Sequence, residues 1–451
     1  MILPQGWVET QLGASCHSIN YGCTSTSDAK RGDIRYIRIT DIQDNDVQWD
    51  NVPYLVTPPK DIKKYELNKG DLLFARTGAT VGKSYLFGDL PYRSVFASYL
   101  IRVRCNENFL CPTYAKWFFQ SPRYWKQIYD GAEGTGQPNF NGTKLAHLVV
   151  PLPPLAEQRR IVAKLDSLTA RIARARAELE RAKRLQKQWL SKFLDSEFSC
   201  DGELLRLGEL AEDVRYGTAQ KCDYNPTLTP VLRIPNIASG NIDTSDLKHS
   251  TFTEKEIKKL SLCSGDLLIV RSNGSIDLVG QSAVADTQVS GFLFAGYLIR
   301  IRLKNKEVTP YFVHYWLRSP QARSAINAAA KSTSGVNNIN SEQLKNLQIK
   351  IPSLSKQRII VSRVIKAFSH ADRLETEAER VLALLDRLES SLLAKAFRGE
   401  LVPQDPDDEP ASVLLDRIQA ERAAAPKPKR GRKQSTQDTP VPRKRQTEKH
   451  G

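Results

Sequence analysis

The sequence predicts a mixed α/β (α+β) protein in which two similar globular domains are separated by two long helices, as a pseudo-twofold internal repeat. Three observations predict this fold class. Apolar or small side chains recur at alternating steps of four and three through residues 157–197, which places them along one side of a long helix. The same pattern returns 199 residues later, through residues 356–397. Short motifs ahead of each helix also recur, at offsets of 195 and 198 residues.

The two long helices are expected to form a coiled coil. An apolar seam this narrow needs a partner, and two matched helices most simply bury each other. Pro153 and Pro154 suit the start of the first helix, and Gly399 suits the end of the second. Gln186 is the polar exception in the seam. It could set the register or mark the centre of the helix pair, but its place past the helix middle favours a frayed or exposed position. The seam is predicted to contain Ile161, Leu165, Leu168, Ile172, Leu179, Trp189, Phe193, Ile360, Val364, Leu374, Val381, Leu385, Leu388 and Leu392.

The seam residues alone leave the direction of the helix pair open. A parallel pair would set Ile172 beside Ala371 and Leu179 beside Ala378, which matches large side chains with small ones. An antiparallel pair would instead set Leu179 beside Leu374. The size match by itself favours the parallel pair.

The globular regions repeat in detail. Gly-Asp-Leu-Leu at residues 70–73, followed by Arg76, returns at residues 265–268, followed by Arg271. These short apolar runs after a turn predict strands. Tyr21-Gly22 likewise returns as Tyr216-Gly217.

Two further segments of each globular region have predictable structure. Residues 99–104 and 297–302 alternate apolar and basic side chains, which is typical of half-exposed strands. Residues 113–121 and 310–319 are predicted to be aromatic-rich helices. The expected organisation is domain 1 at 1–152, helix 1 at 153–199, domain 2 at 200–351, helix 2 at 352–399, a short helical region at 400–423 and a disordered basic segment at 424–451.

Composition indicates an anionic partner. The formal net charge is +16 and the isoelectric point is near 9.4, which favours nucleic acid. Seven scattered cysteines give no disulfide framework or zinc-finger spacing. The first residues lack a signal-peptide pattern and no apolar run reaches membrane length. We therefore expect a cytoplasmic protein with no membrane partner and no metal site.

Several motifs, taken in order, resemble the specificity (S) subunit of a Type I restriction–modification system. They are Pro-x-Gly-Trp at residues 4–7, the two Gly-Asp-Leu-Leu…Arg blocks, the proline-rich helix entry at residues 151–159 and the ending at residues 394–401. The resemblance covers nearly all of residues 1–423. The second helix entry, residues 352–358, departs from the pattern because it lacks the second proline and the glutamate, although it keeps the Gln-Arg pair.

The resemblance implies a non-catalytic DNA-binding subunit. Each globular domain would recognise one half of a bipartite site in double-stranded DNA. An antiparallel helix pair would space the halves and dock two modification (methyltransferase) subunits, which restriction/motor subunits join. S-adenosylmethionine, ATP and Mg²⁺ would belong to those partners, and this chain would hold no cofactor.

The candidate DNA contacts are polar side chains in the loops of the two domains. Arginine can pair with guanine or hold phosphate, and amides suit adenine edges, although turn chemistry explains loop asparagines equally well. The candidates are Arg76, Lys83, Gln137, Asn139, Asn141, Arg271, Asn273, Gln281, Asn337 and Asn338.

Three other functions compete with this hypothesis. The first is a recognition subunit of a related system with a fused methylase–nuclease partner, and the second is a coiled-coil scaffold without DNA specificity. The third is an enzyme. Residues 78–84 fall one residue short of a phosphate-binding loop, and residues 51–54 miss an adenine-methyltransferase motif by one position. No catalytic constellation emerges from the sequence.

Overall fold

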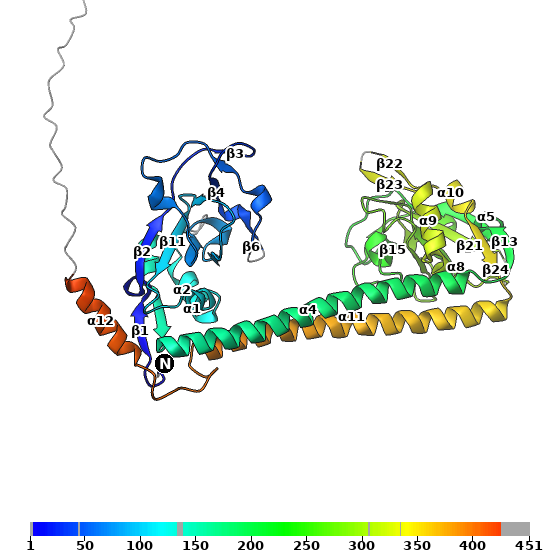
Figure 1. Ribbon diagram of the computed structural model, residues 1–451. Helices are drawn as coiled ribbons and strands as arrows, with labels where there is room; N and C mark the ends of the chain where they lie inside the picture. The colour runs from blue at the N-terminus through cyan, green and yellow to red at the C-terminus, as the bar shows by residue number, and fades with distance from the viewer. Residues whose placement is uncertain (1–2, 44–45, 133–138, 305–306, 334, 425–451) are drawn as a thin grey trace, which may run out of the picture. The chain divides into compact units, whose positions relative to one another are not determined.

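The computed structural model describes residues 3–43, 46–132, 139–304, 307–333 and 335–424 (Figure 1). The chain divides into two compact units. Unit 1 combines Met1–Ile172 with Asp386–Gly451, and unit 2 is Ala173–Leu385. Each unit therefore contains a globular region and parts of both long helices.

The globular part of unit 1 is built mainly from short strands (Figure 1). Along the chain, its α-helices follow the last strand of the main sheet. Its strands are β1 Val8–Gln11, β2 Cys16–Tyr21, β3 Ser27–Asp28, β4 Arg35–Ile37, β5 Ile42–Gln43, β6 Asp46–Val47, β7 Tyr54–Leu55, β8 Asp71–Ala75, β9 Ser84–Leu86, β10 Ser94–Phe96, β11 Leu100–Cys105 and β12 Val149–Leu152. Its helices are α1 Pro112–Phe118, α2 Pro122–Gly131, α3 Gly142–Ala146 and α12 Ala411–Ala424, with 3₁₀ turns η1 Leu12–Ser15, η2 Ile39–Asp41, η3 Trp49–Asn51, η4 Ile62–Tyr65 and η5 Gly78–Thr80.

Unit 2 repeats this order with different loops. Its strands are β13 Glu203–Arg206, β14 Ala211–Tyr216, β15 Thr229–Leu232, β16 Lys248–Ser250, β17 Leu267–Val270, β18 Ser272–Asn273, β19 Ser282–Val284, β20 Leu293–Phe294, β21 Leu298–Leu303, β22 Lys331–Thr333, β23 Val336–Asn338 and β24 Gln348–Ile351. Its helices are α5 Leu207–Leu210, α6 Ile234–Ile237, α7 Glu254–Leu260, α8 Pro310–Leu317, α9 Pro320–Ala329 and α10 Ser341–Lys345.

The main sheets of the two units share one topology. The strand order is β2-β11-β8-β9 in unit 1 and β14-β21-β17-β19 in unit 2, and every pairing in both is antiparallel. A two-stranded pair, β1-β12 or β13-β24, joins the beginning of each globular region to its end. The internal repeat predicted from the sequence is therefore also a repeat of strand order and pairing. Unit 2 adds the small sheet β18-β23-β22, which the sequence did not indicate.

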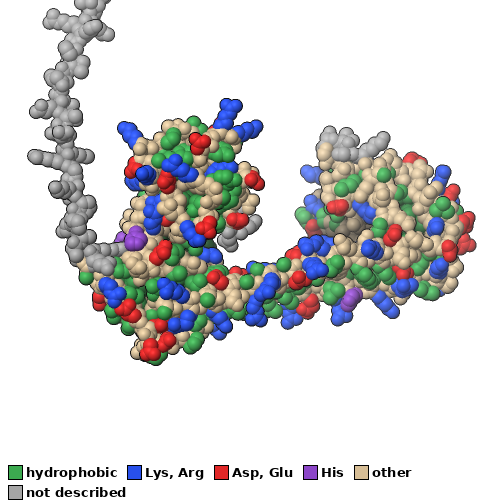
Figure 2. Space-filling view, viewed as in Figure 1, with side chains coloured by type: hydrophobic (Ala, Val, Ile, Leu, Met, Phe, Trp, Pro, Cys, Tyr) green, Lys and Arg blue, Asp and Glu red, His purple; other side chains and the backbone are tan. Residues whose placement is uncertain are grey.

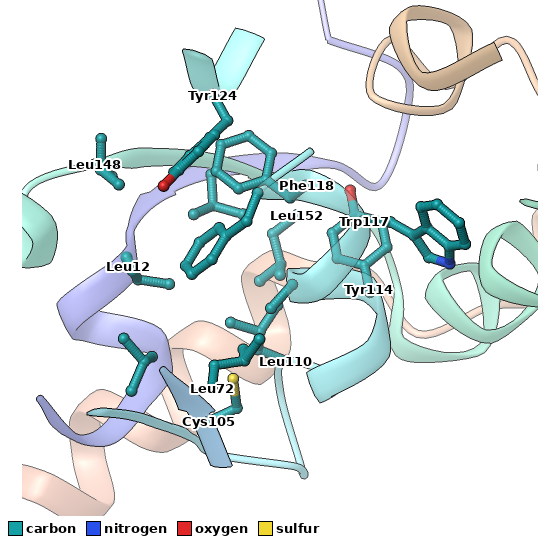
Figure 3. Close-up of a cluster of buried hydrophobic side chains, with 14 of the residues drawn as sticks. Leu12, Leu72, Cys105, Leu110, Tyr114, Trp117, Phe118, Tyr124, Leu148 and Leu152 are labelled. Atoms are coloured by element: carbon teal, nitrogen blue, oxygen red, sulfur yellow. The ribbon is translucent and has the colours of Figure 1, made fainter. Parts of the chain in front are cut away.

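The core of unit 1 unites the sheet, the helices and the end of the second long helix. Leu12, Leu72 and Phe118 meet in one cluster (Figure 3). The ring of Phe397 lies 5.2 Å from that of Tyr114 and 5.4 Å from that of Phe118. The chain after the long helix is thus part of the core of unit 1.

The long helices, α4 Leu155–Phe198 and α11 Leu354–Ala396, run antiparallel (Figure 1). In unit 1 the beginning of α4, at Ile161 and Leu165, shares a core with the end of α11. In unit 2 the end of α4, at Leu194 and Phe198, shares a core with the beginning of α11. The direction favoured by side-chain size alone was wrong, and the direction implied by the family resemblance is confirmed.

Gln186 helps to define the register of the helix pair, contrary to the expectation that it is exposed. Its half-buried side-chain amide donates to the carbonyl oxygen of Ala371 at 2.6 Å. Glu197 and Arg363 form a second cross-helix contact, an ion pair of 2.8 Å. These contacts set a register about one to two turns away from the expected antiparallel pairing of Leu179 with Leu374.

The predicted seam is correct at its ends and wrong at four positions. Ile161, Leu165, Ile172, Ile360 and Val364 are buried. Leu168, Leu179, Phe193, Leu385 and Leu392 are half-buried. The four exceptions remain 36–50% exposed: Trp189, Leu374, Val381 and Leu388.

The helical period explains the three of these errors that lie on α11, at Leu374, Val381 and Leu388. From Ile360 to Ala396 the less exposed positions of α11 recur about every 3.6 residues, the spacing of a straight α-helix. A strict 3.5-residue repeat drifts by about 20° per heptad from that line. Residues assigned by the stricter repeat therefore leave the buried face in the middle of the helix.

The repeated Gly-Asp motif holds a buried ion cluster in each unit. The carboxylate of Asp71 accepts hydrogen bonds from Arg104 at 2.8 and 2.9 Å, and the Arg102 guanidinium lies 3.8 Å away. Asp266 accepts equivalent bonds from Arg302, at 2.7 Å. Arg102 is buried, so the prediction of a half-exposed strand was wrong at this position. Its guanidinium lies beside the Asp71 carboxylate and donates to the carbonyls of Glu66 and Lys64, at 2.6 and 3.1 Å.

Candidate nucleic-acid interface

Positive charge alone does not locate an interface on this protein. Figure 2 shows Lys and Arg side chains spread over the globular surfaces and along the long helices. Most described arginines of the main sheets are also paired with carboxylates, as Arg104 and Arg302 are. Hydrogen bonding to Asp71 raises the pKa of Arg104, and hydrogen bonding to Asp266 raises that of Arg302. The candidates of interest are cations that the fold positions without neutralising them.

Arg76 in unit 1 is such a cation. It follows β8, and its peptide N–H donates to the Tyr99 carbonyl at 3.2 Å while its own carbonyl accepts from Phe140 at 2.9 Å. Its guanidinium carbon lies 4.9 Å from the centre of the Tyr21 ring, a cation–π distance. Its Nε is buried without a hydrogen-bond partner. Among the described residues, no carboxylate pairs with this side chain.

Tyr21 is fixed in place beneath Arg76. Its hydroxyl oxygen accepts a hydrogen bond of 2.7 Å from the backbone N–H of Gly142, the first residue of α3. Tyr21 is the last residue of β2, and 41% of its surface remains exposed. The ring therefore forms a rigid and accessible platform for the guanidinium.

Unit 2 contains the same constellation. The guanidinium carbon of Arg271 lies 4.6 Å from the Tyr216 ring centre. The Tyr216 hydroxyl accepts from the backbone N–H of Ser341, the first residue of α10, at 2.8 Å. Arg271 differs from its counterpart in one respect, because its Nε donates to the amide oxygen of Asn338 at 3.4 Å. No carboxylate of the described part of unit 2 pairs with it.

Sequence reasoning selected both arginines but missed both tyrosines as site residues. The signal was available, because Tyr21-Gly22 and Tyr216-Gly217 recur at the same offset of 195 as the arginines. The glycine explains part of that repeat. A Cβ on Gly22 would lie 2.2 Å from the backbone oxygen of Ala97, so only glycine permits this close strand approach.

Lys83 and Gln281 occupy corresponding positions with different environments. Lys83 is exposed and lines a cavity of about 480 Å³ together with Tyr85, Gln120 and Trp125. Gln281 is half-buried, and its carbonyl accepts from the backbone N–H of Val270. The loops before these residues also differ, since unit 2 has three more residues between Arg271 and Val279 than unit 1 has between Arg76 and Val81.

Two of the loop asparagines in unit 1 have contrasting roles. Asn141 caps α3, because its side-chain oxygen accepts from the N–H of Lys144 at 2.9 Å. Asn139 is exposed and pairs through its backbone with Thr77. Gln137, which the sequence also nominated, lies outside the described residues. The capping role of Asn141 is the turn chemistry that competed with a DNA contact.

The asparagines of unit 2 gather on the small sheet β18-β23-β22. The amide nitrogen of Asn337 donates to the carbonyl of Gly274 at 3.0 Å, and the Asn273 side chain accepts from the N–H of Ser275 at 2.9 Å. Asn338 pairs with Arg271, as described above. The structure thus brings Arg271, Asn273, Asn337 and Asn338 together, whereas contact of any of them with DNA stays a prediction.

The described residues contain no cluster of His, Cys, Asp or Glu that would hold a metal ion. No helix within the described ranges is both long enough and apolar enough to cross a bilayer.

Comparison with known proteins identifies the repeated unit. The model of the family "Type I restriction modification DNA specificity domain" matches this chain twice, over residues 4–184 and 201–382. The EcoKI specificity subunit of Escherichia coli (strain K12) is 29% identical over 466 residues, which cover 96% of this chain and 99% of that protein. The EcoBI specificity subunit of Escherichia coli is 30% identical over 361 residues, covering 71% and 74%.

Solved structures share the fold. A chain from a structural study of assembly and conformational transition in the type I R-M system superposes with a TM-score of 0.72 at 23% identity, covering 89% of this chain and 100% of that one. The HsdS subunit from Thermoanaerobacter tengcongensis gives a TM-score of 0.58 at 22% identity, covering 89% and 99%. These likenesses confirm the predicted fold class, and the two family matches together span most of the sequence. The chain belongs to the family of Type I restriction–modification DNA specificity subunits.

Proposed function

We propose that this chain is the sequence-specific DNA-binding subunit of a Type I restriction–modification complex, in which each globular region recognises one half of a bipartite site. The observation that carries this proposal is the duplication of the family's DNA specificity domain, with an arginine–tyrosine platform at the equivalent place in both copies. Two similar but non-identical domains suit two different half-sites. The net charge of +16 supports a polyanionic partner.

The helix pair is proposed to dock two modification subunits, which restriction/motor subunits join. Its exposed large apolar residues support a protein partner: Trp189, Leu374, Val381 and Leu388. Large apolar side chains left in water can mark a protein interface, and these four lie on the two long helices. The internal repeat supports two equivalent docking positions rather than one.

Catalysis is proposed to reside in the partner subunits. The curated relatives carry the name of specificity subunits, which supports a recognition role for this chain. S-adenosylmethionine, ATP and Mg²⁺ would then be bound by the methyltransferase and motor subunits, and the assembly would act on DNA in the cytoplasm. The basic segment predicted at residues 424–451, of which 425–451 lie outside the described residues, would add nonspecific affinity for DNA.

Sequencing of methylated adenines in the host, with and without this gene, tests the proposed function. We expect one bipartite methylated motif to disappear on deletion and to return when the gene is supplied again. A host in which the gene and its partner genes are expressed, but in which no motif depends on this chain, would contradict the proposal. The competing scaffold function predicts that unchanged pattern.

A further inference from the structure

We infer that the Arg76–Tyr21 and Arg271–Tyr216 pairs are twin binding sites for DNA phosphate, which hold each domain on the duplex without recognising its bases. The inference rests on the proposed function and concerns how that function is divided among residues. Contacts to phosphate fix position and orientation, whereas contacts to base edges carry sequence information. Arg76 and Arg271 could make either phosphate contacts or base contacts.

In each unit the fold positions an arginine side chain without pairing it with a carboxylate of the described residues. In each unit a tyrosine hydroxyl is fixed by the first backbone N–H of a short helix, and the ring supports one face of the guanidinium. A guanidinium held over a ring can still offer donors on its edge to an anion. In these two arginines the terminal nitrogens are left for that role, because Nε is buried in Arg76 and bonded to Asn338 in Arg271. Arg104 and Arg302, by contrast, are each paired with a buried aspartate. The described residues offer Arg76 and Arg271 no such carboxylate.

The arginine–tyrosine pair is present in both units, whereas the residues around it differ. Lys83 is replaced by Gln281, and the intervening loop is three residues longer in unit 2. Trp125 lines the cavity of unit 1, whereas the corresponding Arg323 donates to the carbonyls of Val279 and Ile276, at 2.5 and 3.1 Å.

Contacts that do not depend on the bases can be shared by two domains whose half-sites differ in sequence. Every half-site presents the same phosphates, whatever its sequence. The shared arginine–tyrosine pair therefore fits phosphate. The neighbouring side chains that differ between the units remain to recognise bases.

Salt-dependent binding of the full chain in its complex with the modification subunits tests this inference. The probes are a duplex carrying the methylated motif and a duplex of the same length with that motif scrambled. Arg76→Ala should weaken binding to both duplexes by the same factor, roughly tenfold, and reduce the slope of log affinity against log salt by about 0.9. Arg271→Ala should do the same from the other unit, which provides a second variant if the first folds poorly.

Two matched variants serve as controls. Arg76→Lys keeps the charge and should retain the salt slope. Lys69→Ala removes an equal charge from an exposed lysine that Asp89 already neutralises at 3.0 Å, and it should leave the slope unchanged.

A loss confined to the motif duplex, or an altered methylated motif, would overturn the inference in favour of base recognition. Unchanged binding to both duplexes would overturn it in favour of a structural role. Failure of the wild-type complex to distinguish the duplexes would instead count against the proposed function.

Discussion

Replacing Asp71 by alanine is expected to destabilise unit 1 by about 3–5 kcal/mol, because the change leaves buried arginine charge without compensation. Asp71 is 1% exposed and Arg102 is 3% exposed. Burial lowers the pKa of Arg102, which reports how poorly its charge is solvated. The Asp71 carboxylate also accepts from the backbone N–H of Asn68 at 2.9 Å, so the turn before β8 would lose a bond as well.

Urea unfolding followed by hydrogen exchange in β8 and β11 measures this loss within unit 1. Asp89→Ala is the matched control, because Asp89 forms an ion pair with Lys69 but its side chain is 89% exposed. An exposed pair of this kind contributes about 0–1 kcal/mol. Equal effects of the two substitutions would show that the buried cluster does not stabilise the domain.

Replacing Gln158 by leucine is expected to cost about 3 kcal/mol and to loosen the start of α4 from unit 1. The buried amide accepts from the N–H of Cys111 at 2.9 Å and donates to the carbonyls of Phe109 and Pro153, at 2.9 and 3.1 Å. Leucine has similar size and leaves these three groups unpaired. Each buried unpaired group costs about 1–3 kcal/mol.

The equivalent change in unit 2 provides an internal repeat of this experiment. Gln357 accepts from the N–H of Thr309 at 2.9 Å and donates to the carbonyls of Glu307 and Pro352, at 2.8 and 2.9 Å. Gln357→Leu should therefore cost the same amount in unit 2. Gln188→Leu, at an exposed position of α4, is the control. Hydrogen exchange in the first turns of α4 and α11 measures the effect, and protection as strong as in the control would contradict this role.

The repeat was visible in the sequence because it preserves residue types that the fold needs at fixed places. The aspartate of Gly-Asp-Leu-Leu is retained since it compensates two arginines of a neighbouring strand. The Gln-Arg pair is present at both helix entries, although the second entry lacks the second proline and the glutamate. Each glutamine makes three hydrogen bonds that hold the helix entry to its unit, which explains why this residue recurs.

Other features depended on contacts that a linear pattern does not contain. Side-chain size favoured a parallel helix pair, but the end of α11 is built into the core of unit 1 through Phe397, which requires an antiparallel one. The exposed position of Leu374 follows from the drift between a 3.5-residue repeat and a straight helix.

The candidate DNA contacts were only partly separable by sequence. Arg76 and Arg271 stood out as a repeated pair, whereas Asn141 could not be distinguished as a helix cap because asparagine suits caps and base contacts alike. Tyr21 recurs as Tyr216 at the same offset of 195 residues as the two arginines. Its residue type did not indicate a binding role, since tyrosine is common in cores and at surfaces.

Exchange of one recognition domain, followed by sequencing of methylated adenines, tests most directly whether each domain recognises its own half-site. Residues 1–152 would be replaced by the corresponding domain of a relative whose methylated motif is different, and the chimera expressed with the modification subunits. We predict that one half of the motif changes to that of the donor, while the other half and the spacing stay the same. A change in both halves, or a motif identical to that of the wild type, would contradict the assignment of one half-site to each domain.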